Sequence, residues 1–156
     1  MDDESSSPRL RILLTENSCL SAEEVQLNLL ELCGCHLLEL CQDEGQGLEV
    51  GLHICEAEEM SQLHGRFMGD PTPTDVMAFE GDESAPHYLG DVVVCWSVAQ
   101  EESGFYHHEA RVELQFYIMH GILHLLGFDD ETEEQREAMH KMQKEALRLE
   151  NILVQS

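Results

Sequence analysis

The segment from His120 to Asp130 reads HGILHLLGFDD, and its spacing is typical of a helix that ends beside a metal ion. His120 and His124 are four residues apart, so on a helix their imidazoles lie one turn apart on the same face. Gly127 can adopt a positive φ at the helix end, which reverses the chain and brings Asp130 back to the two histidines. Two histidines and one carboxylate leave a fourth tetrahedral position open for water, as in a catalytic zinc site.

The residues around the two histidines favour a metal site over two ordinary polar positions on an amphipathic helix. The neighbouring side chains are apolar, namely Ile118, Met119, Ile122, Leu123, Leu125 and Leu126. An unpaired imidazole buried among such residues costs free energy, whereas a bound metal ion gives it a partner. We therefore expect His120, His124 and Asp130 to bind one zinc ion per chain.

The residue after the first histidine separates two classes of metal enzyme. The spacing H-x-x-x-H-x-x-G-x-x-D is also that of metzincin-like proteases, which carry a glutamate directly after the first histidine as general base. This chain has Gly121 at that position. A metallopeptidase is therefore the disfavoured interpretation, because the attack of water on a peptide bond lacks its carboxylate.

Helices are predicted on both sides of this segment. One helix is expected from His107 to Leu126, and a short acidic helix that ends near Ser103 precedes it. After the segment, Thr132 and Gln135 form a capping box that opens a last helix to about Asn151. The apolar face of this last helix is predicted to comprise Ala138, Met142, Ala146 and Leu149.

Farther towards the amino terminus the chain alternates between predicted strands and helices. The predicted strands are Leu10–Leu14, Leu48–Cys55, Val76–Phe79 and Leu89–Trp96. The last of them is almost continuously apolar, so we expect it at the centre of the sheet with both faces covered. Ser21 and Glu24 form a capping box for a helix that ends near Cys35, where Gly34 supplies the stop signal. A second helix is expected from Glu56 to Phe67.

This order of elements predicts an α+β fold. Strands in the first two thirds and helices in the last third favour a single domain, with a mixed four-stranded sheet, about five packed helices and a zincin-like metal site. Residues 1–8 are acidic and serine-rich, so we expect a disordered leader there. The domain is expected to span residues 9–151, and residues 152–156 to form a tail.

The charge of the chain excludes several functions. Eight Lys and Arg residues stand against 32 Asp and Glu residues, which gives a net charge of −24. Non-specific binding to DNA or to an anionic membrane through a basic surface is therefore excluded as a main activity. No apolar run approaches the roughly 18 residues of a membrane span, and the acidic start resembles neither a secretory signal nor a transit peptide. We expect a cytoplasmic protein.

The six cysteines are expected to be free thiols, because a reducing compartment disfavours disulfides. Cys33, Cys35 and His36 form a cluster with two possible roles. Its one-residue gap differs from the usual spacing of zinc ligands, and no second cysteine pair follows. Packing at the end of a helix is therefore the favoured role over metal binding.

Two motifs identify a family resemblance. His120-Gly-Ile-Leu-His124-Leu-Leu-Gly-Phe-Asp129-Asp130 matches the H-G-x-L-H-L-x-G-[YF]-D-H motif of the YbeY family, the bacterial rRNA-maturation endoribonucleases that resemble metalloproteases. Pro73-Thr-Asp75-Val-Met-Ala-Phe79 matches the P-T-D-V-L-S-F motif of the same family, and Gly90-Asp91-Val-Val-Val-Cys95 resembles its G-D-I-x-I-C strand. The ordered similarity spans about Leu63 to Leu147.

The chain departs from this family at two positions. The third ligand of the family is usually histidine, whereas this chain has Asp130, which is a competent zinc ligand but removes one positive charge from the site. An alignment without gaps from Leu63 to Asp75 places Met68 where the family usually has a functionally important arginine. The nearest substitute for that arginine is Arg66.

The resemblance implies metal-assisted hydrolysis of a phosphodiester in single-stranded RNA, acting in rRNA processing and ribosome quality control, with ribosomal particles and assembly proteins as partners. Zinc lowers the pKa of its water towards about 7 and polarises a phosphoryl oxygen. The general base is not identified; the candidate catalytic residues are Asp129 and Arg66. Asp129 is alternatively a partner that orients a ligand histidine or an acid near the next helix start. Asp75 is favoured as a cap that braces its strand.

The predicted last helix carries a stripe of basic residues with two possible roles. Arg136, Lys141, Lys144 and Arg148 lie on the last helix, either as a contact for RNA or the ribosome or, as we favour, as a solvated face. The acidic excess also fits a saline environment.

The alternative to an endoribonuclease is a non-catalytic ribosome-assembly factor in which zinc is structural and the partners have basic surfaces.

Overall fold

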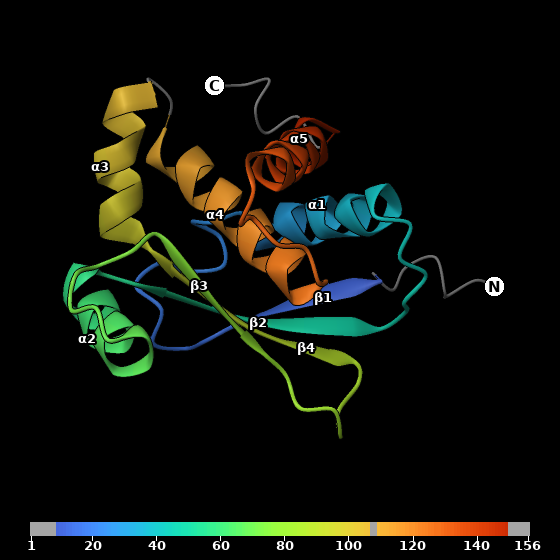
Figure 1. Cartoon of the computed structure of the whole chain (residues 1–156), viewed down its shortest axis with the longest axis horizontal. Helices are drawn as coiled ribbons and strands as arrows, with labels where there is room; N and C mark the ends of the chain where they lie inside the picture. Colours follow the sequence, from blue (N-terminus) through green and yellow to red (C-terminus); the bar gives the residue numbers. More distant parts are fainter. Residues whose placement is uncertain (1–8, 107–108, 150–156) are drawn as a thin grey trace.

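The computed structural model describes residues 9–106 and 109–149, which form one mixed sheet and its covering helices (Figure 1). The strands are β1 (Leu10–Leu14), β2 (Leu48–Cys55), β3 (Val76–Glu80) and β4 (Tyr88–Cys95). The helices are α1 (Leu27–Leu40), α2 (Ala57–Met68), α3 (Trp96–Tyr106), α4 (Ala110–Leu125) and α5 (Glu133–Leu149). The strand order is β1-β2-β4-β3, with only β3 antiparallel to its neighbour. The predicted α+β fold is confirmed.

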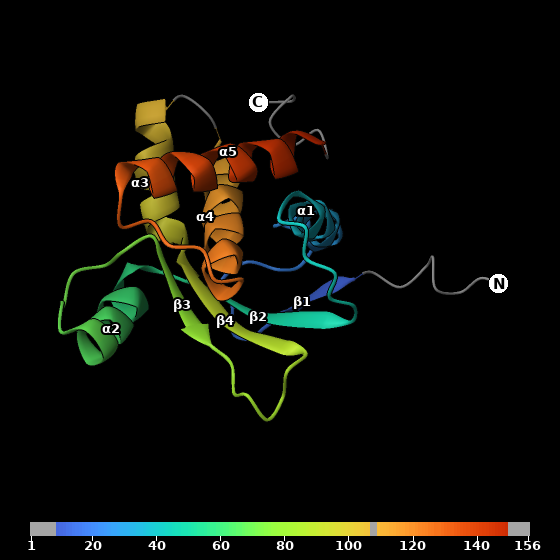
Figure 2. The same ribbon diagram turned by 45° about the vertical axis from the view of Figure 1, so that its right-hand side comes forward.

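The two faces of the sheet are covered by different helices. On β4, Val92 and Val94 face the main core beneath α1 and α4, whereas Val93 and Cys95 face a smaller core that includes Met60 of α2. This division follows from the alternation of side chains along a strand. Figure 2 shows α1, α4 and α5 gathered on one side of the sheet, with α2 at one end of it. The predicted central place of β4 is confirmed, and its carboxyl-terminal half is covered on both faces.

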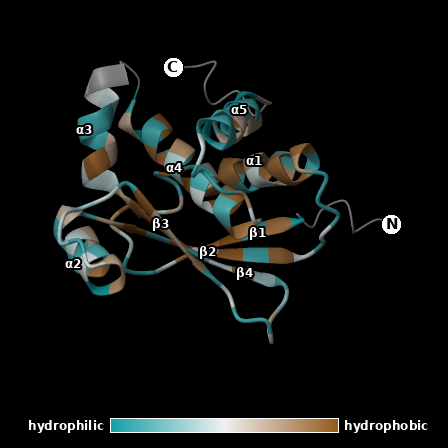
Figure 3. Ribbon diagram, viewed as in Figure 1, coloured by the Kyte–Doolittle hydropathy of each residue, from teal (hydrophilic) through white to brown (hydrophobic). Residues whose placement is uncertain are grey.

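Helix α4 lies at the centre of the helical layer. Its buried residues occupy almost the whole circumference, and it packs on β3, β4, α3 and α5. A helix that is buried on most of its sides is expected in the interior of a domain. Figure 3 shows hydrophobic colouring concentrated in the strands and in α1, while α5 presents a largely hydrophilic surface. None of the helices in the described part of the chain is long and apolar enough to cross a membrane.

The prediction for the first helix is wrong at both ends. Ser21 and Glu24 do form the capping box, with bonds of 2.8 and 3.1 Å, but it closes only a turn. Gln26 then adopts a left-handed conformation, and α1 begins after it at Leu27. Gly34 does not stop the helix; it lies inside α1, where a Cβ atom would approach the Cδ2 atom of Leu10 to 2.3 Å. Its function is close packing against β1.

The boundaries of the later helices differ in smaller ways. Trp96 begins α3 rather than ending a strand, and the capping box of Thr132 and Gln135 opens α5 as predicted. The apolar face predicted for α5 is confirmed in part: Ala146 is buried and Met142 packs against the core, whereas Ala138 is exposed. Met139 and the polar Gln143 are buried beside them, and the side chain of Leu149 lies outside the described part. The predicted leader, tail and helix start at His107 lie outside the described residues.

Candidate metal centre

His120, His124 and Asp130 converge on one point at the carboxyl end of α4. The Nε2 atoms of the two histidines are 3.0 Å apart, and Oδ2 of Asp130 lies 3.2 Å from Nε2 of His120 and 3.4 Å from Nε2 of His124. Within residues 9–106 and 109–149, this is the only group of three or more His, Cys, Asp or Glu side chains close enough to share a metal ion. The sequence spacing predicts this group.

The end of α4 brings the carboxylate back to the histidines. Gly127 has a φ of 102°, a conformation that residues with a Cβ rarely adopt. The amides of Gly127 and Phe128 donate to the carbonyls of His124 and Leu123, at 3.0 and 3.1 Å, and so close the last turn. This reversal carries Asp130 back along the helix, as the glycine in the sequence predicts.

Two residues of α5 hold the ligands in place. The guanidinium of Arg136 donates to the backbone carbonyls of Asp130 and Glu131, at 3.2 and 3.3 Å. Gln143, only 6% exposed, places its Oε1 atom 3.3 Å from Nδ1 of His120 and donates from Nε2 to the carbonyl of Phe116, at 3.0 Å. An amide oxygen can only accept a hydrogen bond, so Nδ1 of His120 carries the proton. Nε2 of His120 is then unprotonated, and its lone pair faces His124 and Asp130.

The geometry and chemistry of this group fit zinc. Ligand atoms about 2.0–2.1 Å from a tetrahedral ion lie about 3.3–3.4 Å from one another, close to the three separations found here. Two imidazole nitrogens and one carboxylate oxygen are borderline ligands of the kind that zinc takes at catalytic sites. The side chains of His120, His124 and Asp130 are 23, 29 and 38% exposed, so the group is reachable from solvent.

The position after His120 faces away from the metal group. Gly121 is buried against the sheet, where a Cβ atom would lie 2.6 Å from Cγ1 of Val92. A glutamate at position 121 would have to displace the side chain of Val92, because the helix turns this position towards β4. The packing thus gives a structural reason for the glycine that separates this chain from the proteases.

A cleft of about 670 Å³ opens beside the metal group, between α4 and α5. His120 and Asp130 line it, together with the acidic side chains of Asp75 and Glu113 and the phenol of Tyr117. Burial first, and then the charges of Glu113 and Asp75, raise the pKa of Tyr117, so its hydroxyl stays protonated at neutral pH. Glu113, Tyr117, His120 and His124 follow one helical face, so this part of the cleft was detectable from spacing.

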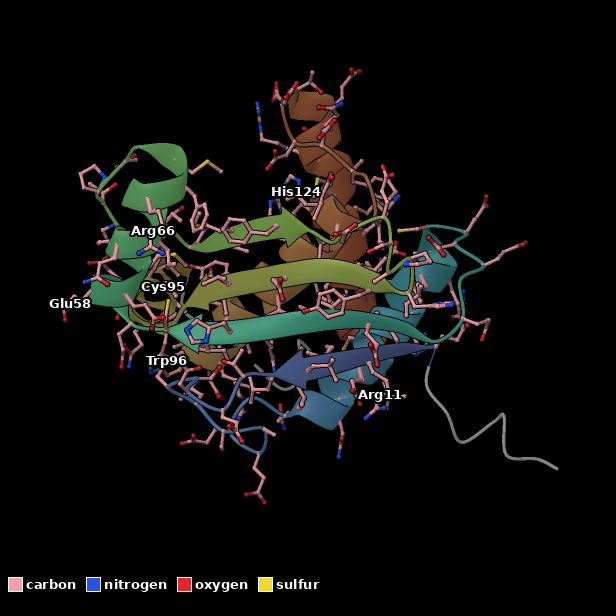
Figure 4. The ribbon with its side chains drawn as sticks, turned by 90° about the horizontal axis from the view of Figure 1, so that it is seen from below. Arg11, Glu58, Arg66, Cys95, Trp96 and His124 are labelled. Atoms are coloured by element: carbon pink, nitrogen blue, oxygen red, sulfur yellow. The ribbon has the colours of Figure 1, made fainter. Side chains whose placement is uncertain are left out.

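The predicted catalytic candidates do not share this cleft. Asp129 is exposed and is not among the residues that line it, nor are Arg66 and Met68. In Figure 4, Arg66 lies on α2 at one end of the sheet, whereas His124 lies on α4 beyond β3. Asp75 caps its own strand through a 2.7 Å bond from the amide of Val76, as expected. The carboxylates that line the cleft besides Asp130 are Asp75 and Glu113.

None of the six cysteines, all of which lie in the described part of the chain, forms a disulfide, and Cys33, Cys55 and Cys95 are buried. Burial, aided by the charge of Cys95, raises the pKa of Cys55 to about 12, which keeps this thiol protonated and inert at neutral pH. Cys33 packs into the core, but it lies in the middle of α1, so the predicted place at a helix end is wrong. The Cys33, Cys35 and His36 side chains do not form a metal-sized group among the described residues.

Comparisons with known proteins identify the relatives of this chain. The family model described as Endoribonuclease YbeY matches residues 17–150. An endoribonuclease YbeY of Acidothermus cellulolyticus is 37% identical over 112 residues, which cover 64% of this chain and 68% of the relative. One of Beutenbergia cavernae is 39% identical over 108 residues, covering 64% of this chain and 72% of the relative.

A solved structure extends the similarity to the fold. The solution structure of a Thermotoga maritima protein superposes with a TM-score of 0.56 at 27% identity, and the match covers 90% of each chain. The family model takes in the whole sheet except β1, and all three candidate ligands. The chain belongs to the endoribonuclease YbeY family.

Proposed function

We propose that this chain is a zinc-dependent endoribonuclease that cuts single-stranded RNA in rRNA maturation, at the 3′ end of 16S rRNA, and in ribosome quality control. The observation that carries the proposal is the convergence of His120, His124 and Asp130 within 3.4 Å beside an open cleft. Membership of the endoribonuclease family supplies the class of substrate. We place the enzyme in the cytoplasm, with ribosomal particles as its partners.

The three ligands would hold one zinc ion, which supplies an activated water and a Lewis acid for a phosphoryl oxygen. The remaining steps belong to this chain's own residues. Gln143 fixes the tautomer of His120, and Arg136 fixes the loop of Asp130 through its backbone carbonyl. The protonated hydroxyl of Tyr117 and the carboxylates of Asp75 and Glu113 line the same cleft, where a group that moves a proton has to lie.

A non-catalytic ribosome-assembly factor is the second candidate function. Met68, which stands at the position of the family arginine, is 65% exposed and does not line the cleft. The net charge of −24 also favours partners with basic surfaces. Under this alternative the zinc is structural, and the protein binds ribosomal particles without cutting RNA.

The sharpest test of the proposed function compares alanine variants of the neighbouring residues Asp129 and Asp130. Wild type, Asp130→Ala and Asp129→Ala are compared for zinc content by elemental analysis and for cleavage of single-stranded RNA. We expect one zinc per chain in the wild type and in Asp129→Ala, and loss of both zinc and cleavage in Asp130→Ala. Cleavage by Asp129→Ala then decides whether Asp129 is the base.

Two results would count against the proposal. Zinc bound without any cleavage by the wild type would favour the assembly factor. Zinc retained at the wild-type level in Asp130→Ala would remove Asp130 from the ligand set. A peptide substrate in the same assay covers the metallopeptidase, which we expect to be inactive because of Gly121.

A further inference from the structure

One wall of the active-site cleft comes from α5. Arg136, His140 and Lys144 line the cleft together with the metal ligands His120 and Asp130. We call these three residues the α5 wall. They are spaced four residues apart, so they form one row along the helix, about 12 Å long from Arg136 to Lys144. The row therefore starts at the loop of the third ligand and extends away from it.

Helix α5 carries an unusually large share of the cations of this acidic chain. The three residues of the α5 wall also line a shallow depression along α5, to which Lys141 and Arg148 add two further cations. Half of the eight Lys and Arg residues of the chain thus lie on this one helix. The depression has four cations against three glutamates, so its charge is near neutral in a chain of net charge −24.

These cations are available to a ligand. Among the described residues, no carboxylate forms an ion pair with Arg136, Lys141, Lys144 or Arg148. Arg136 uses its Nη1 atom for two backbone carbonyls, and one of these belongs to Asp130. A phosphate bound by Arg136 therefore lies next to the loop that carries a metal ligand.

An aromatic pair lies between the two cations of the wall. The rings of Phe116 and His140 are stacked, with centroids 5.7 Å apart and planes 11° from parallel. His140 is exposed, so its ring extends the stack towards solvent. Bases of single-stranded nucleic acid stack on such aromatic platforms without regard to sequence, while cations beside the platform contact the backbone.

We propose that the α5 wall binds the backbone of single-stranded RNA, with Arg136 and Lys144 on phosphates and one base stacked on His140. This inference rests on the proposed endoribonuclease function and names where its substrate lies. Met68 on α2 offers no cation at the position of the family arginine, whereas Arg136 and Lys144 place two cations in the cleft beside the metal ligands. Local neutralisation of phosphates by these two cations explains how a strongly acidic chain holds a polyanion.

The test compares single-charge variants of the zinc-loaded full-length protein. Lys144→Gln removes a cation from the α5 wall, Arg11→Gln removes one from the exposed face of the edge strand β1, and Arg66→Gln removes one from α2 (Figure 4). All three change the net charge equally. His140→Ala removes the stacking ring, and His140→Phe restores it.

Binding is measured by fluorescence anisotropy with a single-stranded 2′-O-methyl RNA that resists cleavage, and cleavage kinetics with unmodified RNA. We expect Lys144→Gln to weaken binding about fivefold or more and to reduce the salt slope of log K by about 0.7. We expect Arg11→Gln to change binding less than twofold. His140→Ala is expected to weaken binding and His140→Phe to recover it. The KM for cleavage rises in Lys144→Gln while kcat is retained.

The possible failures are distinguishable. If the wild type cuts RNA but only Arg66→Gln weakens binding, the endoribonuclease stands and the α5 wall is overturned in favour of α2. If Lys144→Gln weakens binding of a polyglutamate peptide but not of RNA, the wall is a site for an acidic protein. If the zinc-loaded wild type neither binds nor cuts RNA, the proposed function fails and the inference fails with it.

Discussion

Gln143 shows how a single buried amide controls the metal centre. Its Oε1 atom accepts from Nδ1 of His120, and its Nε2 atom donates to the carbonyl of Phe116. We expect Gln143→Leu to lower zinc affinity about 10- to 100-fold, because the His120 ring loses the partner that sets its tautomer and orientation. Competition with a chromophoric chelator measures this affinity. Equal affinity in Gln143→Leu and wild type would refute the role.

The sequence reveals the ligands but not this partner. His120 and His124 are recognisable because both lie on one helix at a fixed spacing. Gly127 indicates the helix end, where the chain reverses and brings Asp130 back to the histidines. Gln143 is 23 residues from His120 and reaches it only because α5 packs across α4. A contact of that kind depends on the angle between two helices, which local periodicity does not encode.

Local sequence signals did not predict the boundaries of α1 correctly. Local signals were present: the capping-box bonds of Ser21 and Glu24 exist, and Gly34 follows an apolar run. Tertiary packing nevertheless determines where α1 begins and ends. Gly34 lies inside the helix because β1 approaches it closely there, and α1 continues to Leu40 over the sheet. The same limit applies to α5, whose capping box was predicted correctly and whose buried face was predicted only in part, because Ala138 is exposed and the polar Gln143 is buried.

Two helical glycines test this interpretation of α1. Alanine generally stabilises a helix by about 1 kcal/mol relative to glycine. At Gly34 we expect the reverse, a loss of about 1 kcal/mol in the free energy of unfolding, because the new methyl group meets the fully buried Leu10 and overpacking costs about 1–3 kcal/mol. Gly104 in α3 is the control: apart from its own helix, no heavy atom of the described residues lies within 4 Å of its Cβ position, so Gly104→Ala is expected to stabilise. Urea unfolding measures both, and stabilisation by Gly34→Ala would contradict the packing role.

At the scale of the whole molecule, the acidic surface and the α5 wall act over different distances. The net charge of −24 repels RNA over the Debye length, which is about 30 Å at 10 mM salt and about 8 Å at 150 mM. The cations of the α5 wall act at contact, where salt competes for phosphates. Salt therefore has opposite effects on the approach of RNA and on the complex once it has formed.

This separation predicts an inverted salt dependence of association. Raising KCl from about 10 to about 150 mM is expected to increase the association rate constant for single-stranded RNA several-fold, because screening removes the long-range repulsion. The dissociation rate constant rises over the same range as contacts to phosphates weaken. Stopped-flow fluorescence with a cleavage-resistant RNA separates the two constants. Lys144→Gln should keep the trend in association and dissociate faster at every salt concentration. If association instead slows with salt, as for basic RNA-binding proteins, the field of the α5 wall extends beyond contact and dominates the acidic surface even at a distance.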